Sequence, residues 1–202
     1  MIKNVIFDLG RALINFDPEA YLEELRLDKE TRKIYLDDIF KGHEWLDLDR
    51  GIITEEQAIK KIVAKGRLKE GAVRKILDAR ISFFTELSLN IPLVKKIKDN
   101  GYKLYILSNF PKIPFEAIFK KYEFFRNFDG GVVSYEEGVN VIKPDSKIYD
   151  ILLSRYNLLP QETIFIDDTL VNIEKAEEYG ITGIHLPDHT ELRKKLIEKG
   201  LI

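Results

Sequence analysis

The sequence predicts an α/β fold, namely a Rossmann-like three-layer core with a parallel sheet and an inserted all-helical segment. Three observations support this prediction. Short runs of branched aliphatic residues recur along the chain, and helical patterns separate the later runs. Between residues 17 and 84, however, only helical patterns occur. Strands that alternate with helices are typical of a parallel sheet covered on both faces, so we expect the helical stretch to be an insertion into such a core.

Four segments are expected to form the strands of the sheet. Each is a nearly continuous apolar run that stops at a polar residue or at glycine, as suits strands buried on both faces. The four segments are Asn4–Phe7, Lys103–Leu107, Thr163–Ile166 and Ile181–Ile184.

Helices are predicted in the second half of the chain because apolar residues recur there at the spacing of one helical face. These positions are Ile148, Ile151, Leu152 and Tyr156 in one segment, and Ile173, Ala176 and Gly180 in another. Pro144 is expected at the first position of the earlier helix, with Asp145 in its first turn. Asp188 and Glu191 have the spacing of a capping box for a final helix.

The stretch from residue 17 to residue 84 breaks the alternation of strands and helices. Its apolar residues have helical spacing, as at Tyr21, Leu22 and Leu25, and again at Ile59, Ile62 and Val63. Thr54 and Gln57 have the spacing of another capping box. We therefore expect an α/β core of residues 1–16 and 85–202 and a helical domain of residues 17–84.

Composition excludes several classes of protein. Hydrophobic residues make up 45% of the 202 residues, enough for a sizeable core, while Lys and Arg (32) nearly cancel Asp and Glu (34). A net charge of −2 provides no broad basic surface, so nucleic acid is not expected as a partner. The absence of cysteine excludes disulfides, thiolate metal sites and cysteine nucleophiles. No apolar run approaches the roughly 18 residues that span a bilayer, and no signal peptide is recognisable, so we expect a soluble cytoplasmic protein without a membrane partner.

Polar side chains follow the predicted strands at the edge of the sheet where ligands bind in open α/β folds. They are Asp8 after the first strand, Ser108 and Asn109 after the second, Asp167 and Asp168 after the third, and Lys143 before a helix. One crevice is therefore expected to hold three carboxylates, a hydroxyl, an amide and an ammonium group.

These groups suit phosphoryl transfer. Clustered carboxylates repel one another unless a cation lies among them, and hard oxygen ligands favour Mg²⁺. A carboxylate held against that cation can attack phosphorus as a nucleophile. Ser108 and Lys143 can hold the phosphoryl oxygens and stabilise their charge. Each residue taken alone is also common in turns and helix caps, so the prediction depends on their occurring together at successive strand ends.

The chain resembles the haloacid dehalogenase superfamily, whose four motifs occur in order. They are Val5-Ile6-Phe7-Asp8-Leu9-Gly10, then Ile106-Leu107-Ser108-Asn109, then Lys143-Pro144-Asp145 with Ile148-Tyr149, and finally Ile164-Phe165-Ile166-Asp167-Asp168 with Asn172, Ala176 and Gly180. The spacing of the fourth motif is the most specific of these signals. Residues 17–84 lie where the superfamily places its substrate-selecting C1 cap, so the resemblance implies that they form a helical cap domain.

The resemblance implies a phosphatase that depends on Mg²⁺ and acts on a small phosphorylated metabolite as a monomer or homodimer. Asp8 would attack phosphorus in line and form an aspartyl-phosphate, which water then hydrolyses. The implied metal ligands are Asp8, the Gly10 carbonyl and Asp168, with Asp167 supporting them through water or by orienting Lys143. The implied phosphate-binding residues are Ser108, Asn109 and Lys143.

One position departs from the pattern of most phosphatases in the superfamily. They carry a second Asp two residues after the nucleophile, as general acid and then base, whereas this chain has Gly10, followed by the bulky Arg11. Loss of a general acid costs about 10²–10⁴-fold when the leaving group needs a proton. We therefore expect a preference for anomeric or otherwise activated phosphates. Asp17 is an alternative proton donor, although a helix N-cap is its more usual role.

Within the superfamily, the Asp8-Leu9-Gly10 start and a segment of the predicted cap resemble the bacterial α-D-glucose-1-phosphate phosphatase-like branch. The cap segment contains His43, Glu44 and Trp45 and continues through Arg50-Gly51-Ile52-Ile53-Thr54-Glu55-Glu56. His43, Glu44 and Trp45 are candidates to line a sugar pocket, because aromatic and polar groups together suit a carbohydrate. Trp45 is equally well explained by packing within the cap.

Two other functions are compatible with parts of the sequence. A 2-haloacid dehalogenase would also lack the second Asp, but those relatives need no metal, and Asp167 and Asp168 therefore oppose this interpretation. A non-catalytic protein that binds sugar phosphates would explain Gly10 and Arg11. The joint presence of Asp8, Ser108, Lys143 and Asp168 opposes it.

Overall fold

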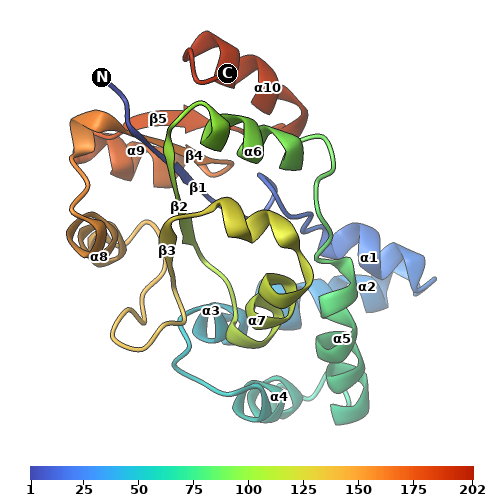
Figure 1. Cartoon of the computed structure of the whole chain (residues 1–202). Coiled ribbons are helices and arrows are strands. Elements are labelled where there is room, and N and C mark those ends of the chain that lie inside the picture. Colours follow the sequence, from blue (N-terminus) through green and yellow to red (C-terminus); the bar gives the residue numbers. More distant parts are fainter.

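The computed structural model describes all 202 residues and contains a five-stranded parallel sheet (Figure 1). In spatial order the strands are β3 (Gly130–Val133), β2 (Lys103–Ser108), β1 (Asn4–Phe7), β4 (Thr163–Asp167) and β5 (Thr182–His185). The chain enters at the centre of the sheet, extends it towards β3, and then crosses over to form β4 and β5. This order places β1 between β2 and β4.

The strand registers explain why the polar ends of the strands meet. Phe7 pairs with Ile106 of β2 and with Ile166 of β4, so the residues that follow these positions lie side by side at the carboxyl edge. Along β1 the apolar side chains alternate between two buried clusters, with Val5 and Phe7 in one and Ile6 in the other. Both faces of the sheet are therefore covered, which is why its strands are apolar throughout.

Two helical layers cover the sheet. The face of Ile6 packs against α8 (Ser146–Tyr156) and α9 (Leu170–Glu178), and the other face packs against α6 (Ile91–Asp99) and α10 (Leu192–Glu198). The predicted three-layer core with a parallel sheet is therefore confirmed. No helix in the chain is both long and apolar enough to cross a membrane.

Between β1 and α6 the chain forms helices and no strand. They are α1 (Pro18–Glu24), α2 (Lys29–Tyr35), a π-helical turn (Leu36–Phe40), α3 (His43–Asp49), α4 (Glu55–Ala64) and α5 (Glu70–Phe83). The predicted capping box opens α4: Thr54 Oγ1 accepts from the Gln57 N–H, and Gln57 Oε1 accepts from the Thr54 N–H. We call residues 17–84 the helical insertion. Figure 1 shows α3, α4 and α5 gathered near α7 (Lys112–Lys121), which follows β2.

The prediction of four strands is incomplete because it lacks β3. Gly130 and Gly131 open this strand, and a sequence pattern treats such a pair as a turn. Both glycines allow close packing: a Cβ on Gly130 would lie 2.4 Å from the ring of Tyr156, and one on Gly131 would lie 2.7 Å from Ile106 Cβ. A close approach of this kind is a common reason for glycine inside a strand.

Two helix starts differ from the predictions. Asp145 is the N-cap of α8 and accepts from the Lys147 N–H, so Pro144 precedes the helix instead of opening it. Asp188 accepts from the Thr190 N–H and caps a 3₁₀ turn (His189–Glu191), so it forms no capping box with Glu191. In both places the carboxylate binds the N–H two residues later, which is the local Asx-turn geometry that competes with a capping box.

Candidate active site

Three carboxylates meet at the carboxyl edge of the sheet. Asp8 follows β1, Asp167 ends β4, and Asp168 comes next. One oxygen of each lies within 4.8 Å of the others. Asp8 and Asp167 are buried, and Asp168 is half-buried. Such a set of hard oxygen donors suits a divalent cation such as Mg²⁺.

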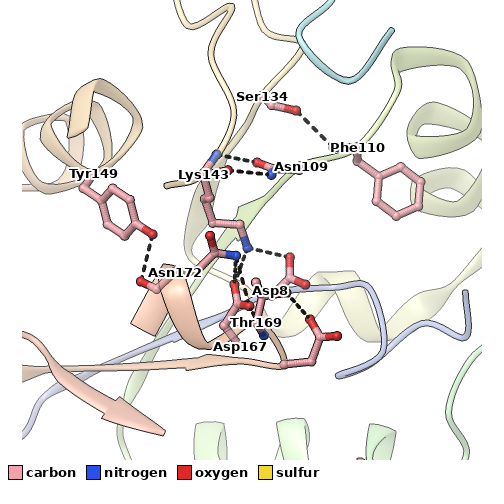
Figure 2. Close-up of polar contacts among 10 residues, drawn as sticks. Asp8, Asn109, Phe110, Ser134, Lys143, Tyr149, Asp167, Thr169 and Asn172 are labelled. Atoms are coloured by element: carbon pink, nitrogen blue, oxygen red, sulfur yellow. Dashed lines mark hydrogen bonds and ion pairs between the residues drawn. The ribbon is translucent and has the colours of Figure 1, made fainter. Parts of the chain in front are cut away.

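A buried ammonium group lies among these carboxylates. Lys143 Nζ is 2.9 Å from Asp8 Oδ1 and 2.5 Å from Asp167 Oδ2. Asn109 holds the backbone of this lysine, because its Oδ1 accepts from the Lys143 N–H (2.8 Å) and its Nδ2 donates to the Lys143 carbonyl (3.2 Å). Figure 2 shows these two bonds and the lysine side chain that extends from them to the carboxylates. The Asn109 side chain therefore positions Lys143. The backbone N–H of Asn109 is left for the predicted phosphate contact.

Donors from three directions hold the Asp167 carboxylate. Besides Lys143, Asn172 Nδ2 lies 3.1 Å from each of its oxygens, and the Thr169 N–H donates to Oδ1 at 2.8 Å. The Tyr149 hydroxyl donates to the Asn172 carbonyl and so fixes the start of α9 against α8 (Figure 2). The bonds already made by Asp167 favour a role in orienting Lys143 over direct binding of a metal.

Burial and the close charges together set the protonation of the site. Burial raises the pKa of Asp8 to about 6, although the Lys143 ammonium lowers it. Burial lowers the pKa of Lys143, but the Asp167 and Asp8 carboxylates outweigh burial and raise it overall. Burial and the charge of Asp167 also raise the pKa of Asp168. The site therefore holds more negative charge than Lys143 balances, and a bound divalent cation would relieve the excess.

Ser108 supplies a further sign that the site is built for a ligand. Its side chain is completely buried, and its Oγ makes no hydrogen bond within 3.5 Å, although it lies near enough to the Asp8 carboxyl group to lower the pKa of that group. A buried hydroxyl without a partner costs free energy that a bound oxyanion would recover. Because β2 runs beside β1, this hydroxyl lies next to the strand end that carries Asp8. The donors present thus fit both a divalent cation and a phosphate group.

The three candidate sugar-pocket residues of α3 have different surroundings. His43 is exposed. Glu44 forms an ion pair with Lys65 at 2.5 Å. Trp45 is buried, and its ring stacks on Phe16 with centroids 5.7 Å apart. Packing within the protein therefore accounts for Trp45, and an ion pair accounts for Glu44.

The structure also shows the contacts of three other polar residues, Asp17, Arg11 and His185. Asp17 is the N-cap of α1 and accepts from the Ala20 N–H. Arg11 Nη1 lies 3.5 Å from Asp168 Oδ2. His185 is half-buried, with its Nε2 3.0 Å from the Asp168 carbonyl. Local spacing gave no sign of this contact, which arises because β5 pairs with β4.

Sequence reasoning missed a buried acid that makes no ion pair. Asp49, the last residue of α3, is 7% exposed, and its Oδ1 has no hydrogen-bond partner. In the sequence it stands between Leu48 and Arg50 in a segment rich in charge, where an acid is normally solvated. Only the packing of the helical insertion on the core shows that this side chain is buried.

Known proteins resemble the chain over nearly its whole length. It is 27% identical to a sesquiterpene phosphatase of Aspergillus oryzae, over 92% of this chain and 90% of that protein. It is 25% identical to a D-ribitol-5-phosphate phosphatase of Bacteroides thetaiotaomicron, over 97% of each chain. The crystal structure of a haloacid dehalogenase family enzyme from Bacteroides thetaiotaomicron in a magnesium complex superposes with a TM-score of 0.76. That enzyme is 28% identical, over 97% of this chain and 98% of the other.

The family assignment agrees with the order of the motifs and with the sheet that carries them. A family model of haloacid dehalogenase-like hydrolases matches residues 2–180, which include all three carboxylates, Ser108 and Lys143. This match extends from β1, which Asp8 follows, to just beyond α9, the helix whose Asn172 supports Asp167. The chain is an enzyme of the haloacid dehalogenase-like hydrolase family.

Proposed function

We propose that this enzyme is a Mg²⁺-dependent phosphatase that hydrolyses a small phosphorylated metabolite through an aspartyl-phosphate on Asp8. The observation that carries the proposal is the buried group in which Lys143 joins Asp8 to Asp167, beside Asp168 and the unpartnered hydroxyl of Ser108. Burying so many charged groups opposes folding, so their presence together favours a chemical role over a structural one.

Each residue of the site has a part in this reaction. Asp8, Asp168 and the Gly10 carbonyl would hold Mg²⁺, whose charge draws in the phosphate and reduces its repulsion of an anionic nucleophile. A carboxylate oxygen of Asp8 attacks phosphorus and displaces the leaving oxygen. The Lys143 ammonium, the Ser108 hydroxyl and the Asn109 N–H bind the phosphoryl oxygens and stabilise their charge. Asp167 keeps Lys143 in place, and water then hydrolyses the aspartyl-phosphate.

The helical insertion is the part of the chain that we assign to substrate selection. It would form a cap domain of residues 17–84 over a core of residues 1–16 and 85–202, with His43 exposed on α3 as a candidate substrate contact. A phosphorylated sugar or polyol is the proposed substrate class, in keeping with the ribitol phosphate named for one relative. We further propose that the enzyme acts on such metabolites in the cytoplasm.

The test is phosphate release from a panel of sugar, polyol and aryl phosphates in the presence of Mg²⁺. The unaltered enzyme is compared with Asp8→Asn, which removes the nucleophile and keeps its size. We expect turnover of at least one member of the panel, and a loss of about 10³-fold or more in the variant. Asp28→Asn is the matched control, because Asp28 caps α2 at the surface and Asn is an equally good N-cap.

The outcomes separate the competing functions. Full activity of Asp8→Asn would contradict the proposed nucleophile. Release of chloride from 2-chloropropionate without phosphate release would favour the dehalogenase interpretation. Binding of sugar phosphates without any turnover would favour a non-catalytic binding protein.

A further inference from the structure

The position two residues after the nucleophile carries no proton donor for the leaving group in the proposed phosphatase. Gly10 has no side chain, and Lys143 is fixed between Asp8 and Asp167. Asp17 is occupied as the N-cap of α1. An alkoxide leaves phosphorus slowly unless it receives a proton. For such substrates the proton has to come from another part of the chain.

The backbone of Asp49, at the end of α3 in the helical insertion, lies close to the site. Its backbone carbonyl accepts from Ser134 Oγ at 2.5 Å, and the Ser134 N–H donates to the Ser108 carbonyl at 3.0 Å. Ser108 ends β2, which runs beside β1, and β1 leads directly to Asp8. The end of α3 is thus connected through one residue to the strand that lies beside the nucleophile.

The two residues after Asp49 are also fastened to the core. Asn140 Nδ2 donates to the Arg50 carbonyl at 2.9 Å. Gly51 lies so close to the backbone of Tyr135 that a Cβ would meet its carbonyl oxygen at 2.6 Å. Residues 49–51 therefore lie against the loop that follows β3, and this contact fixes where the Asp49 side chain is held.

The carboxyl group of Asp49 has no structural partner. Its Oδ1 is buried and makes no hydrogen bond, and it takes part in none of the ion pairs of the protein. The nearby buried Arg80 pairs instead with Glu55. A buried, unpaired carboxylate is strongly unfavourable, so the neutral acid is the stable form.

The charges around Asp49 are consistent with a protonated side chain. Burial raises its pKa to about 8, and the negative charge of Asp8 acts in the same direction, whereas Arg50 and Arg80 lower it. An acid that carries its proton at neutral pH is what protonation of a leaving group requires.

We propose that Asp49 is the general acid and then the general base of this enzyme, in place of the side chain that Gly10 lacks. This role rests on the proposed phosphatase function. As Asp8 forms its bond to phosphorus and the bond to the leaving oxygen breaks, the Asp49 proton passes to that oxygen and an alcohol departs. Water then attacks phosphorus, its proton passes to the Asp49 carboxylate, and the bond from Asp8 to phosphorus breaks to release phosphate. Both carboxyl groups return to their first states.

This assignment changes the expected substrate preference. The sequence predicts a preference for activated phosphates because Gly10 cannot donate a proton. With Asp49 as donor, the enzyme hydrolyses phosphates of ordinary alcohols as well. Glucose-6-phosphate, whose leaving group is an ordinary alcohol, then becomes a suitable substrate beside glucose-1-phosphate. Dependence on Asp49 should therefore grow as the leaving group becomes more basic.

The test compares Asp49→Asn with the unaltered enzyme on p-nitrophenyl phosphate and on an alkyl phosphate that the enzyme hydrolyses. Nitrophenolate needs no proton to leave, so the variant should release one equivalent of nitrophenolate per active site at the normal rate. It should then stall as the aspartyl-phosphate, because the general base for the attack by water is missing. Release of alcohol from the alkyl phosphate should fall by about 10²–10⁴-fold in kcat, with KM little changed. Mass spectrometry of the stalled variant should show the phosphorylated chain.

Two further variants complete the test. Asp47→Asn makes the same change on the same helix, where Asp47 faces Arg50 and Lys61, and should retain both activities. Asp49→Glu should recover part of the alkyl phosphatase activity, because it restores the carboxyl group. An equal loss in the rate of the first release of nitrophenolate and of alcohol, or no loss in either rate, would overturn the role of Asp49. Failure of the unaltered enzyme to hydrolyse any phosphate would instead remove the proposed function, and with it this role.

Discussion

Two buried acids of this enzyme are in opposite situations. Asp167 receives hydrogen bonds from Lys143, Asn172 and Thr169, so its negative charge is compensated. Asp49 is also buried, but no cation or donor holds its carboxyl group. A group that is buried without partners lowers stability, and such groups persist mainly where activity requires them. The contrast therefore supports a chemical role for Asp49 and a positioning role for Asp167.

The cost of Asp49 gives a prediction about stability and pH. Its pKa is about 8 in the folded chain and near the ordinary value of 3.8 in the unfolded chain, so the unfolded state loses its proton first as the pH rises. Unfolding is thereby favoured progressively between about pH 4 and pH 8. Asp49→Asn removes this effect and should raise the free energy of unfolding at pH 8 by an amount on the order of several kcal/mol.

Thermal denaturation at a series of pH values checks this prediction. The melting temperature of Asp49→Asn should exceed that of the unaltered enzyme at pH 8, and the difference should shrink towards pH 4. Asp47→Asn, whose acid is partly exposed and paired, should show no such gain. A variant that is less stable than the parent at pH 8 would mean that the Asp49 carboxylate is stabilised in the fold.

Most residues of the candidate site could be predicted because their positions depend on short segments. Asp8, Ser108 and Asp168 each follow or end a strand, and parallel strands bring such residues to one edge whatever else the chain does. Asp49 and His185 could not be predicted in this way. Asp49 reaches the site through packing of the insertion on the core, and His185 through pairing of the last two strands.

At the level of elements, the end of α3 is where the helical insertion contacts the loop that follows β3 in the core. Gly51 has φ +66°, a conformation that L-residues rarely adopt, and its Cα faces the Tyr135 backbone. Gly51→Ala should therefore cost about 1 kcal/mol for the conformation and about 1–3 kcal/mol more for the clash. Because the clash displaces the segment that carries Asp49, kcat on an alkyl phosphate should also fall by about 10-fold or more.

Gly66→Ala is the matched control for this prediction. Gly66 also follows a helix and has φ +79°, but nothing lies within 4 Å of a Cβ placed there. This variant should lose only about 1 kcal/mol of stability, measured by chemical denaturation, and should keep its kcat. Equal effects of the two substitutions on kcat would show that the contact with Tyr135 does not position the site.

The elements themselves were predictable to the extent that their patterns are local. Strands such as Thr163–Asp167 and the capping box at Thr54 follow from residues within one segment. The strand β3 could not be predicted from its own segment. Gly130 and Gly131 are explained only by the side chains of Tyr156 and Ile106 that pack on them. The start of α8 differed because the Asp145 side chain caps the helix where the sequence pattern placed it inside.

At the scale of the whole molecule, folding of the core assembles the negative charge of the site. The residues of the site come from three strand ends and from the segment before α8, and they meet only when the sheet forms. The unfolded chain therefore has no equivalent cluster of carboxylates. A cation that binds this cluster therefore binds the folded state alone. Binding to the folded state stabilises a protein in proportion to the logarithm of the ligand concentration.

Mg²⁺ should accordingly raise the melting temperature of the metal-free enzyme. At about 100 times its dissociation constant the gain is about 2.7 kcal/mol, or on the order of 5–10 °C for a chain of this size. Because protons compete for the same carboxylates, and the pKa of Asp8 is about 6, the gain should diminish as the pH falls through that value. Asp168→Asn should abolish most of the gain, whereas Asp28→Asn should leave it intact. A shift of equal size in Asp168→Asn, measured by calorimetry after removal of metal with a chelator, would place the cation elsewhere on the molecule and would separate its binding from the carboxylates that meet at the sheet edge.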